Sequence, residues 1–293
     1  MRTTLRNSLP FGRHALFASA SLLAGAVAQA AEQPTTALAS VTVTAQRHEE
    51  SAQDIGLAVT ALSGEALQEK GVTNVNQLQN YVPNLDIAPQ YGSGNPLFRI
   101  RGVGLKDYGS NNTSTVGVYL DQVALPYPIQ TQGQLFDLER VEVLRGPQGT
   151  LYGRNSTAGA INFITNKPTR ELHGGLTSNY GSYNASSVEG FISGPVSDTL
   201  RARLAFITEQ GGAWQDNRDT GQSLGDKDTT SLRGQLDWDA SDAINFNLSV
   251  HGGKDQSDSR GSYLYQGLKP NATYGSRYST IAPESNGKKT GWA

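Results

Sequence analysis

Hydrophobic and polar positions alternate in the second half of the chain. In residues 200–208, 232–239 and 244–251, apolar residues or glycine recur at every second position, and the positions between them are mostly polar. A period of two indicates a β-strand with one apolar and one polar face. Residues 175–180 and 185–192 alternate more weakly, and we expect them to form two further strands.

The connections between these strands alternate between short and long. The chain turns tightly at residues 194–198 and 240–242, whereas residues 211–228 and the stretch after Asp255 are long and polar. This order is typical of an outer-membrane β-barrel, which has brief periplasmic turns and extended outer loops. A soluble β-sandwich shows the same alternation within its strands, so the barrel is favoured by the connections alone.

The segment 52–168 has a mixed α/β pattern. A short helix is predicted from Ser63, a capping residue, to Lys70, and Asn74 with Gln77 resembles the capping box of a second helix. Strands are predicted at residues 57–62, 97–101, 116–120, 140–144 and 160–165. We therefore expect an α+β domain at 52–168, followed by a strand-rich region at 169–293.

Residues 1–30 have the layout of a secretory signal peptide. Three arginines precede the mostly apolar stretch 15–27, and Ala28-Gln29-Ala30 supplies a small-x-small cleavage pattern. An N-terminal anchor helix is the alternative, but the apolar run is short and rich in small residues. We expect export to a bacterial envelope, with residues 31–51 as a polar periplasmic leader.

Composition and motifs exclude several classes of function. The chain of 293 residues has no cysteine and a net charge of −2, which excludes thiol chemistry and zinc ribbons and argues against nucleic-acid binding. The histidines are isolated, the pair Gly102 and Gly104 lacks a third glycine, and no nucleophile elbow is present. We therefore expect no catalytic residue, no metal site, no cofactor and no enzymatic activity.

Several motifs give the chain a family resemblance. They lie at Ser40–Ala45, Ile100–Gly104, Val116–Asp121, Leu138–Gly153 and Ala158–Thr165. With the signal peptide and the barrel-type strands, they make the chain resemble a TonB-dependent outer-membrane receptor. The resemblance implies an α+β plug domain, followed by the start of a transmembrane antiparallel β-barrel that has about 22 strands in the family.

The resemblance also implies a function and a set of partners. Such receptors sit in outer-membrane lipid, bind a small molecule from outside the cell and take it up with energy from the inner-membrane complex of TonB with ExbB–ExbD. A ferric siderophore is the default cargo. Cobalamin, an oligosaccharide or an aromatic compound stays open, and a passive envelope barrel or adhesin is the alternative from another class.

The leader contains a candidate segment for binding TonB. It is short and β-prone, so it could add a strand to the edge of a partner's sheet. We call this the coupling segment, and it consists of Ser40, Val41, Thr42, Val43, Thr44 and Ala45. The alternative is a mere linker.

Arg101 and Arg145 each lie at a strand end and are followed by glycine. In the family, the matching arginines pair with glutamates of the barrel wall and lock the plug in place; exposed surface arginines are the alternative. In this chain we expect them to be solvated or to find partners within the plug, because the first barrel strands offer no acidic residue to them. A bidentate contact with Asp237 or Asp239 would contradict this expectation.

Two glycine-containing loops of the plug are candidates for binding ligand. Their side chains suit hydroxyl-rich, neutral or aromatic ligands as well as anionic ferric chelates. The candidate residues are Tyr91, Ser93, Asn95, Tyr108, Ser110, Asn111, Asn112 and Thr113.

The length of the chain sets one further expectation. After the plug there is room for about six strands at roughly 20 residues for each strand and its connection. The smallest closed bacterial barrels have eight strands. We therefore expect the chain to be an N-terminal portion of a longer receptor.

Overall fold

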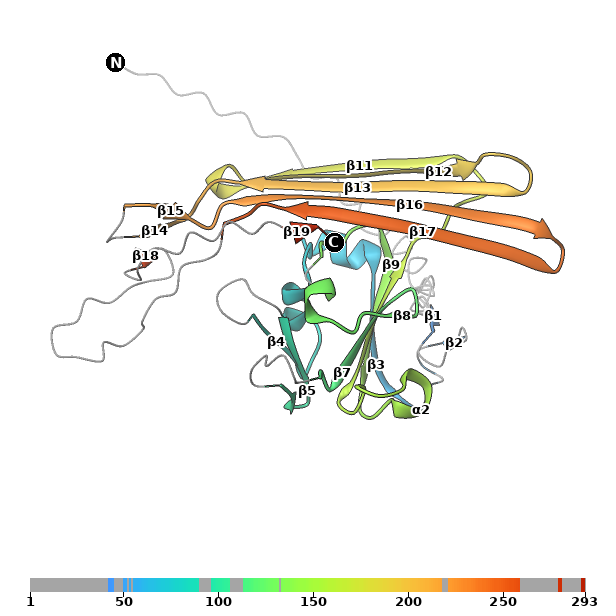
Figure 1. Cartoon of the computed structure of the whole chain (residues 1–293), viewed down its shortest axis with the longest axis horizontal. Coiled ribbons are helices and arrows are strands. Elements are labelled where there is room, and N and C mark those ends of the chain that lie inside the picture. Colours follow the sequence, from blue (N-terminus) through green and yellow to red (C-terminus); the bar gives the residue numbers. More distant parts are fainter. Residues whose placement is uncertain are drawn as a thin grey trace, which may run out of the picture. The chain divides into compact units, whose positions relative to one another are not determined.

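The computed structural model divides into two compact units, Met1–Ser40 and Val41–Ala293, and all the described residues lie in the second (Figure 1). The expected signal peptide and most of the leader lie outside the described part. The described residues are 42–44, 50–51, 53, 55–89, 96–105, 113–131, 133–217, 221–258, 279–280 and 291–292.

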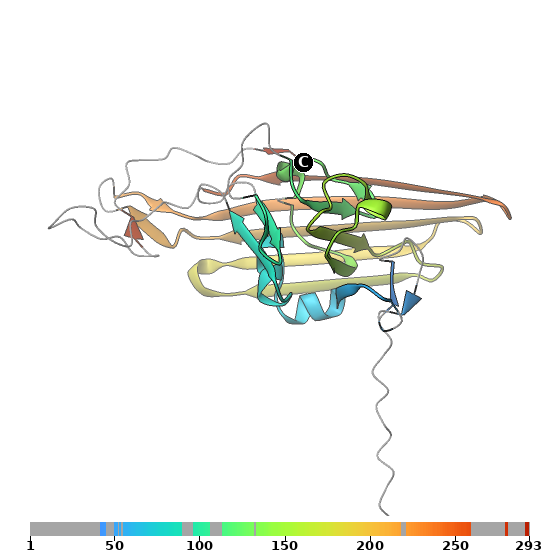
Figure 2. The ribbon, with the colours of Figure 1, turned by 90° about the horizontal axis from the view of Figure 1, so that it is seen from below.

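A five-stranded mixed sheet forms the centre of the N-terminal α+β region (Figure 2). Its central strands β9 and β10 are almost wholly buried, which suits their apolar composition. β10 pairs in parallel with β7, and the other pairings are antiparallel. In spatial order the strands are β3 (Ala58–Ser63), β9 (Leu138–Arg145), β10 (Gly159–Thr165), β7 (Val116–Leu120) and β8 (Val123–Ala124).

Each face of this sheet carries its own hydrophobic cluster. The larger one packs Val141 and Val143 of β9 against Leu67 and Leu78 from the helices. The smaller one lies on the other face and includes Leu144 and Ala160, together with residues that precede β3. Side chains alternate across a strand, so neighbouring residues of β9 enter different clusters.

Two short helices lie where the capping residues predict them. Ser63 accepts a hydrogen bond from the Ala66 amide at the start of α1 (Gly64–Glu69). The capping box of Asn74 and Gln77 is formed, but the helix it opens, η1 (Val75–Asn80), is a 3-10 helix. The remaining helices are η2 (Pro128–Thr131), α2 (Gly149–Tyr152) and η3 (Ser182–Asn184). No helix among the described residues has the length and apolar character needed to cross a membrane.

Several small strands complete the N-terminal region. The sequence patterns did not predict β4, which pairs with β5 in a three-stranded sheet. These strands are β1 (Thr42–Val43), β2 (Glu50–Ser51), β4 (Leu85–Pro89), β5 (Pro96–Ile100) and β6 (Val103–Gly104).

The C-terminal region is an antiparallel sheet of six strands, five of them long. Strands β16 and β17 have 15 and 12 residues, more than the 9–11 residues that a tilted strand needs to cross a bilayer. In spatial order the strands are β11 (His173–Tyr180), β12 (Ser186–Pro195), β13 (Leu200–Gly211), β16 (Lys227–Ser241), β17 (Ile244–Asp255) and β19 (Gly291–Trp292).

The long sheet is open among the described residues, since no pairing joins β11 to β19. A second, small sheet is formed by segments that connect strands of the six-stranded sheet, and it contains β14 (Gln215–Asn217), β15 (Ser223–Leu224) and β18 (Ser279–Thr280). The long connection after β13 and the tight turn between β16 and β17 are both as the sequence predicts.

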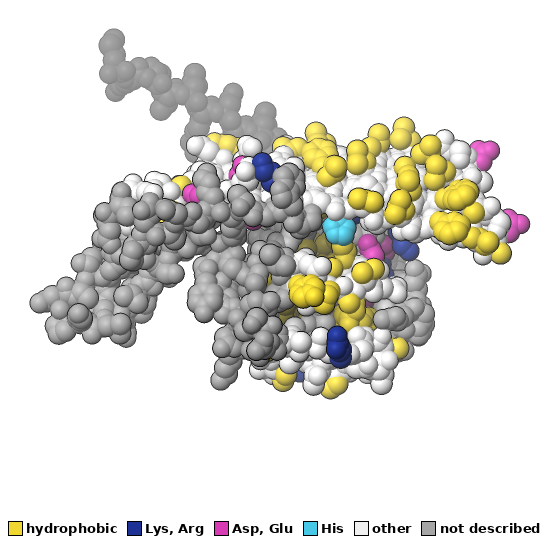
Figure 3. Space-filling view, in the orientation of Figure 1, with side chains coloured by type: hydrophobic (Ala, Val, Ile, Leu, Met, Phe, Trp, Pro, Cys, Tyr) yellow, Lys and Arg dark blue, Asp and Glu magenta, His cyan; other side chains and the backbone are white. Residues whose placement is uncertain are grey.

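The two faces of the long sheet have opposite character. In β13, Arg203 and Glu209 are buried, whereas Leu204 is 46% exposed. Apolar side chains gather along the long strands (Figure 3), and those that are exposed include Leu232, Leu236, Phe246, Leu248 and Val250. A soluble sandwich would bury this face. An apolar outward face with polar residues inside is the arrangement of a transmembrane barrel, which confirms the predicted fold class.

Candidate functional site

Half of the coupling segment lies in the described part of the chain. Thr42 and Val43 form β1 and pair antiparallel with Ser51 and Glu50 of β2. Val43 has no exposed surface and belongs to the smaller hydrophobic cluster. Ser40, Val41 and Ala45 lie outside the described residues. Thr42 and Val43, in the described half of the coupling segment, are therefore extended and held against the plug.

A buried carboxylate fixes Thr44 to the plug. The Thr44 amide donates to Oε1 of Glu142 at 2.6 Å, and the Thr44 hydroxyl donates to the same oxygen at 3.1 Å. Nε of Arg140 also donates to Oε1 of Glu142, at 2.8 Å. Glu142 has no exposed surface, and a buried charge of this kind is stable only with such partners.

Sequence reasoning missed the role of Glu142 and Arg140, although both lie in a motif that it singled out. The available signal was the charge itself. Glu142 stands in the middle of β9, between Val141 and Val143, and its neighbours in the sheet are Ala61 and Asn162. A carboxylate in the central strand of a sheet requires donors from the chain that covers it.

The two predicted lock arginines lie at the strand ends where the sequence places them. Arg101 follows β5, is exposed and has a φ of +53°, whereas Arg145 ends β9 and is half-buried. A Cβ at Gly146 would lie 3.7 Å from Nη1 of Arg101, so the Arg101 guanidinium lies beside the residue that follows Arg145. Within the described part of the chain, neither arginine forms an ion pair.

A contact of Asp237 or Asp239 with Arg101 or Arg145 would have contradicted the expectation that these arginines are solvated or paired within the plug, but both carboxylates bind another arginine. Asp237 and Asp239 both contact Nη2 of Arg201, at 3.0 and 2.9 Å. Their partner lies on the neighbouring strand of the same sheet. The role of Arg101 and Arg145 as locks stays a prediction.

A different ion pair joins the plug to the long sheet. Nε of Arg203 donates to Oδ2 of Asp137 at 2.8 Å, and its Nη2 contacts the other oxygen of the same carboxylate. The two side chains are only 5% and 2% exposed. The Arg203 guanidinium also lies over the ring of Phe191, 4.1 Å from its centre. The carboxylate belongs to the plug and the guanidinium to the sheet, the reverse of the predicted locks.

The backbone around Asp137 makes further contacts with the sheet. The Asp137 amide donates to Oε1 of Glu189 at 2.8 Å. Nη1 of Arg233 donates to the Phe136 carbonyl at 3.2 Å, and the guanidinium lies over the Phe136 ring, 4.5 Å from its centre. Residues 136–137 therefore fit between Arg203 and Arg233 of the sheet. We call this segment, together with Gln134, the anchor loop.

Acidic residues of the first barrel strands do face the plug, but they contact residues other than the predicted lock arginines. Glu189 meets Asp137 as described, and Oε2 of Glu209 accepts from Nε2 of Gln134 at 2.7 Å. The sequence patterns gave no sign of these contacts, because Glu189 lies in a weakly alternating strand and Glu209 lies just beyond the predicted end of its strand. Neither carboxylate contacts Arg101 or Arg145 in the described part of the chain.

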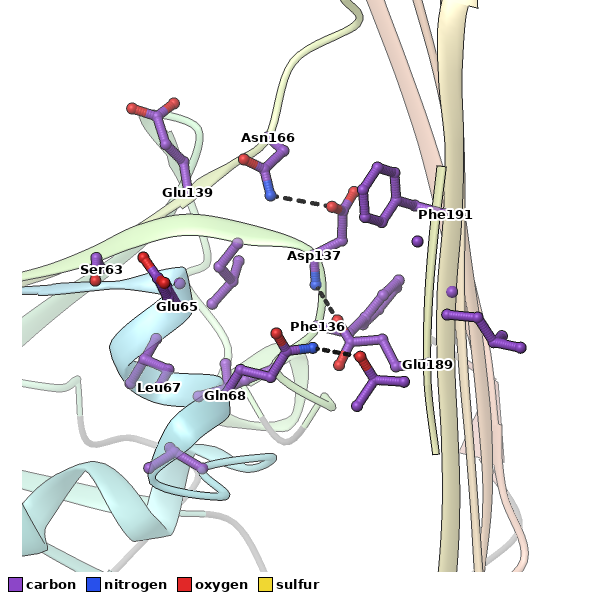
Figure 4. A pocket seen from close by; sticks show the side chains of 18 residues that line it. Ser63, Glu65, Leu67, Gln68, Phe136, Asp137, Glu139, Asn166, Glu189 and Phe191 are labelled. Carbon is purple, nitrogen blue, oxygen red and sulfur yellow. Dashed lines mark hydrogen bonds between the residues drawn. The ribbon is translucent and has the colours of Figure 1, made fainter. Parts of the chain in front are cut away.

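A cavity of about 560 Å³ separates α1 from the inner face of β11 and β12 (Figure 4). Nε2 of Gln68 donates across it to the hydroxyl of Thr177, at 3.1 Å. Glu65, Asp137, Asn166 and Glu189 are among the residues that line it, and Nδ2 of Asn166 donates to Asp137 at 3.0 Å. The plug thus packs tightly on the sheet at the anchor loop and loosely at α1.

The ligand candidates lie almost entirely outside the described part of the chain. Thr113 is the exception and is exposed just before β7. The remaining candidates are Tyr91, Ser93, Asn95, Tyr108, Ser110, Asn111 and Asn112. The ligand-binding role of these loops stays a prediction.

Comparison with known proteins relates this architecture to a family. Residues 51–160 match the TonB-dependent Receptor Plug Domain. The chain is 32% identical over 176 residues to the pesticin receptor of Yersinia pestis, covering 59% of this chain and 25% of that protein. It is 26% identical over 238 residues to the ferrioxamine B receptor of Salmonella typhimurium, covering 79% of this chain and 30% of that protein.

Solved structures show the same fold. The ferric yersiniabactin uptake receptor FyuA from Yersinia pestis matches with a TM-score of 0.61 and 26% identity, over 68% of this chain and 31% of that one. The pyoverdine outer membrane receptor FpvA from Pseudomonas aeruginosa PAO1 matches with a TM-score of 0.67 and 20% identity, over 82% of this chain and 34% of that one.

An α+β domain seated on the polar face of an outwardly apolar sheet defines a plugged β-barrel protein of the outer membrane. Residues 51–160 form a plug domain of the TonB-dependent receptor type, and most of the chain is similar to curated bacterial receptors. It spans about a quarter to a third of the length of the curated relatives that it matches.

Proposed function

We propose that the receptor containing this chain takes up a ferric siderophore across the outer membrane by TonB-dependent transport. One observation carries the proposal: the coupling segment and the plug are joined at a central strand of the plug sheet. Thr44 is bound to Glu142 in β9, and the anchor loop directly before β9 is fixed to the barrel-type sheet. Force applied to the coupling segment therefore acts on the domain that fills the lumen.

Energy coupling follows from the location. The outer membrane holds neither ATP nor an ion gradient, so work has to come from the inner membrane through TonB and ExbB–ExbD. Thr42 and Val43 are already extended, which suits the addition of a strand to the edge of a TonB sheet. A passive pore or adhesin would require neither a coupling segment nor a plug.

The cargo class is inferred from the relatives. The matched proteins include a ferrioxamine B receptor, a ferric yersiniabactin uptake receptor and a pyoverdine receptor. These names support an iron-loaded siderophore as the small-molecule ligand over an oligosaccharide or an aromatic compound. The polar loop candidates can donate hydrogen bonds to such a chelate.

Replacement of Val43 by proline tests the coupling role. Proline removes one backbone donor and fixes φ, so strand addition should fail. Cells that produce the complete receptor with Val43→Pro should bind a radiolabelled ferric siderophore at the surface and lose its uptake. Val43→Ala keeps the backbone donor and is the matched control, with uptake retained. Normal uptake by Val43→Pro would refute the proposal.

A further inference from the structure

We propose that the outward face of the long sheet binds one anionic phospholipid of the periplasmic leaflet, with an acyl chain in a groove and the headgroup on Lys167 and Arg170. Contact with bulk lipid follows from an apolar outward face alone. A site for one lipid molecule requires in addition a hollow of fixed shape and a charged mouth. The proposal concerns a surface that the uptake proposal does not use, so the two are tested independently.

The first support is a hollow in the outward face, which we call the outer groove. It has a volume of about 480 Å³ and is lined by residues of β12, β13, β16 and β17, with Leu172 from the chain before β11. Small residues form its floor. Gly194 lies opposite Ala202, and Gly234 lies opposite Leu204, two positions farther along β13. The larger apolar residues of the lining are Leu172, Ile192, Leu204, Leu236, Leu248 and Val250. A concave apolar surface of this kind fits a hydrocarbon chain.

The second support is that the described part of the chain leaves Gly234 uncovered. A Cβ added there would meet no atom within 4 Å. Gly190 shows the contrast, because it shares the outward face with Ile192 and an added Cβ would lie 2.8 Å from Cε1 of Phe206. A glycine inside a strand weakens the strand and often marks a place where a ligand approaches closely. The bare glycine therefore points to a group from outside the chain that occupies the outer groove.

The third support is the level of the outer groove in the membrane. Its end at Gly194 lies beside the tight turn between β12 and β13, and short turns of this kind face the periplasm. Trp238 and Phe246 lie two positions closer than Leu236 and Leu248 to the other tight turn, between β16 and β17. Their rings stack with centres 5.7 Å apart, and both side chains are about half exposed. Because aromatic residues gather at the headgroup level, the outer groove begins there and extends into the hydrocarbon of the periplasmic leaflet.

The fourth support is positive charge beside the periplasmic end of the outer groove. Lys167 and Arg170 are exposed and form no ion pair within the described part of the chain. Arg170 comes two positions before Leu172, whose Cα would lie 3.2 Å from a Cβ on Gly194. The one acidic residue between Lys167 and Leu172 is Glu171, so this stretch keeps a net positive charge. Basic residues next to a membrane-embedded groove select an anionic headgroup.

The test of the outer groove uses the complete receptor in detergent, with dioleoyl-phosphatidylglycerol as the probe and native mass spectrometry as the readout. The wild-type receptor should retain one phosphatidylglycerol after the other lipids are removed. Gly234→Leu places a side chain in the hollow, so the retained fraction should fall several-fold. Ala202→Leu fills the floor farther along and serves if Gly234→Leu does not fold. Thr230→Leu, on the same strand and face but outside the outer groove, is the matched control and should retain the lipid. Equal retention by wild type and both groove variants would overturn the proposal.

Removal of the two positive charges tests the headgroup. The wild-type receptor should retain dioleoyl-phosphatidylglycerol several-fold better than dioleoyl-phosphatidylethanolamine, which has no net charge. Lys167→Gln combined with Arg170→Gln should abolish this preference and leave the acyl groove intact. Asp198→Asn, which removes a charge from the exposed turn between β12 and β13, is the control and should keep the preference. Equal retention of the two lipids by wild type would overturn the assignment of an anionic phospholipid.

A second readout locates the bound lipid. Phosphatidylglycerol with a diazirine in the middle of its acyl chain cross-links on illumination to the residues that it touches. We expect cross-links at Leu204, Leu236 and Leu248, and several-fold fewer of them in Gly234→Leu. Cross-links spread evenly over the outward face would show bulk lipid only and overturn the proposal. Displacement of the probe by lipopolysaccharide, and not by unlabelled phosphatidylglycerol, would assign the outer groove to lipopolysaccharide and overturn it as well.

Discussion

Two buried carboxylates, Glu142 and Asp137, lie only five positions apart and are held in different ways. Asp137 binds the guanidinium of Arg203 through both of its oxygens. Glu142 uses one oxygen for all its described bonds, and two of the three donors belong to Thr44. A bidentate guanidinium pair has a fixed geometry, whereas backbone and hydroxyl donors from a terminal segment can leave with it. The plug therefore has a firm attachment and a releasable one on adjoining stretches of chain.

The largest effect is expected from removing the firm attachment. Asp137→Ala leaves Arg203 buried without its carboxylate. The free energy of unfolding of the plug and the sheet it contacts should fall by about 3–5 kcal/mol. Thermal denaturation of the purified receptor, with protease sensitivity of the plug, measures the loss. Asp198→Ala, in an exposed turn, is the control. A loss smaller than that caused by Glu142→Leu in the same assay would reverse the ranking of the two attachments.

A smaller effect is expected at the predicted locks. Arg145→Ala in the complete receptor should loosen the plug and raise the passage of large antibiotics several-fold, because a charged lock in a crowded lumen would be lost. Antibiotic sensitivity at equal receptor abundance is the measurement. Arg154→Ala, an exposed arginine on a nearby loop, is the matched control. Wild-type permeability would show that Arg145 is a surface residue.

The smallest effect is expected for Arg201, whose ion pairs in the described part of the chain stay within its own sheet. Arg201 contacts Asp237 and Asp239 on the neighbouring strand. The side chains of Arg201 and Asp239 are 13% and 41% exposed, so solvent screens this cluster more than the pair of Asp137 and Arg203, and Arg201→Ala should cost less than Asp137→Ala in the same thermal assay. If Arg201→Ala lowers the stability as much as Asp137→Ala does, the loss of stability depends on the charges within the sheet and not on the anchor loop.

Local signals in the sequence predicted much of the fold. The capping residues Ser63 and Asn74 mark true helix starts, and the period of two locates the long strands. The patterns missed β4, which ends at a proline in Leu85–Pro89 and is stabilised by its pairing with β5. The predicted strands also ended too early. The alternation fades before residues such as Glu209, whereas the pairing with the neighbouring strand continues through them.

The site was less predictable because its contacts join distant residues. Thr44 and Glu142 are 98 positions apart, and Asp137 and Arg203 are 66 apart. Position within a strand indicates which face a side chain occupies, but not which partner from another element lies opposite. The family resemblance pointed to Arg101 and Arg145, because they match motif positions known from the family. It gave no indication of the pair Asp137 and Arg203.

The alternation of the long strands also bears on export and assembly. Each strand carries an apolar residue at only every second position, so no stretch of it is hydrophobic enough to be retained as a helix in the inner membrane during secretion. The same strands, once paired in water, would present exposed residues such as Leu204 and Leu248 as an adhesive surface. We therefore expect the polypeptide to cross the periplasm with its hairpins unpaired and protected by chaperones, and to form the sheet only where lipid is available to cover it.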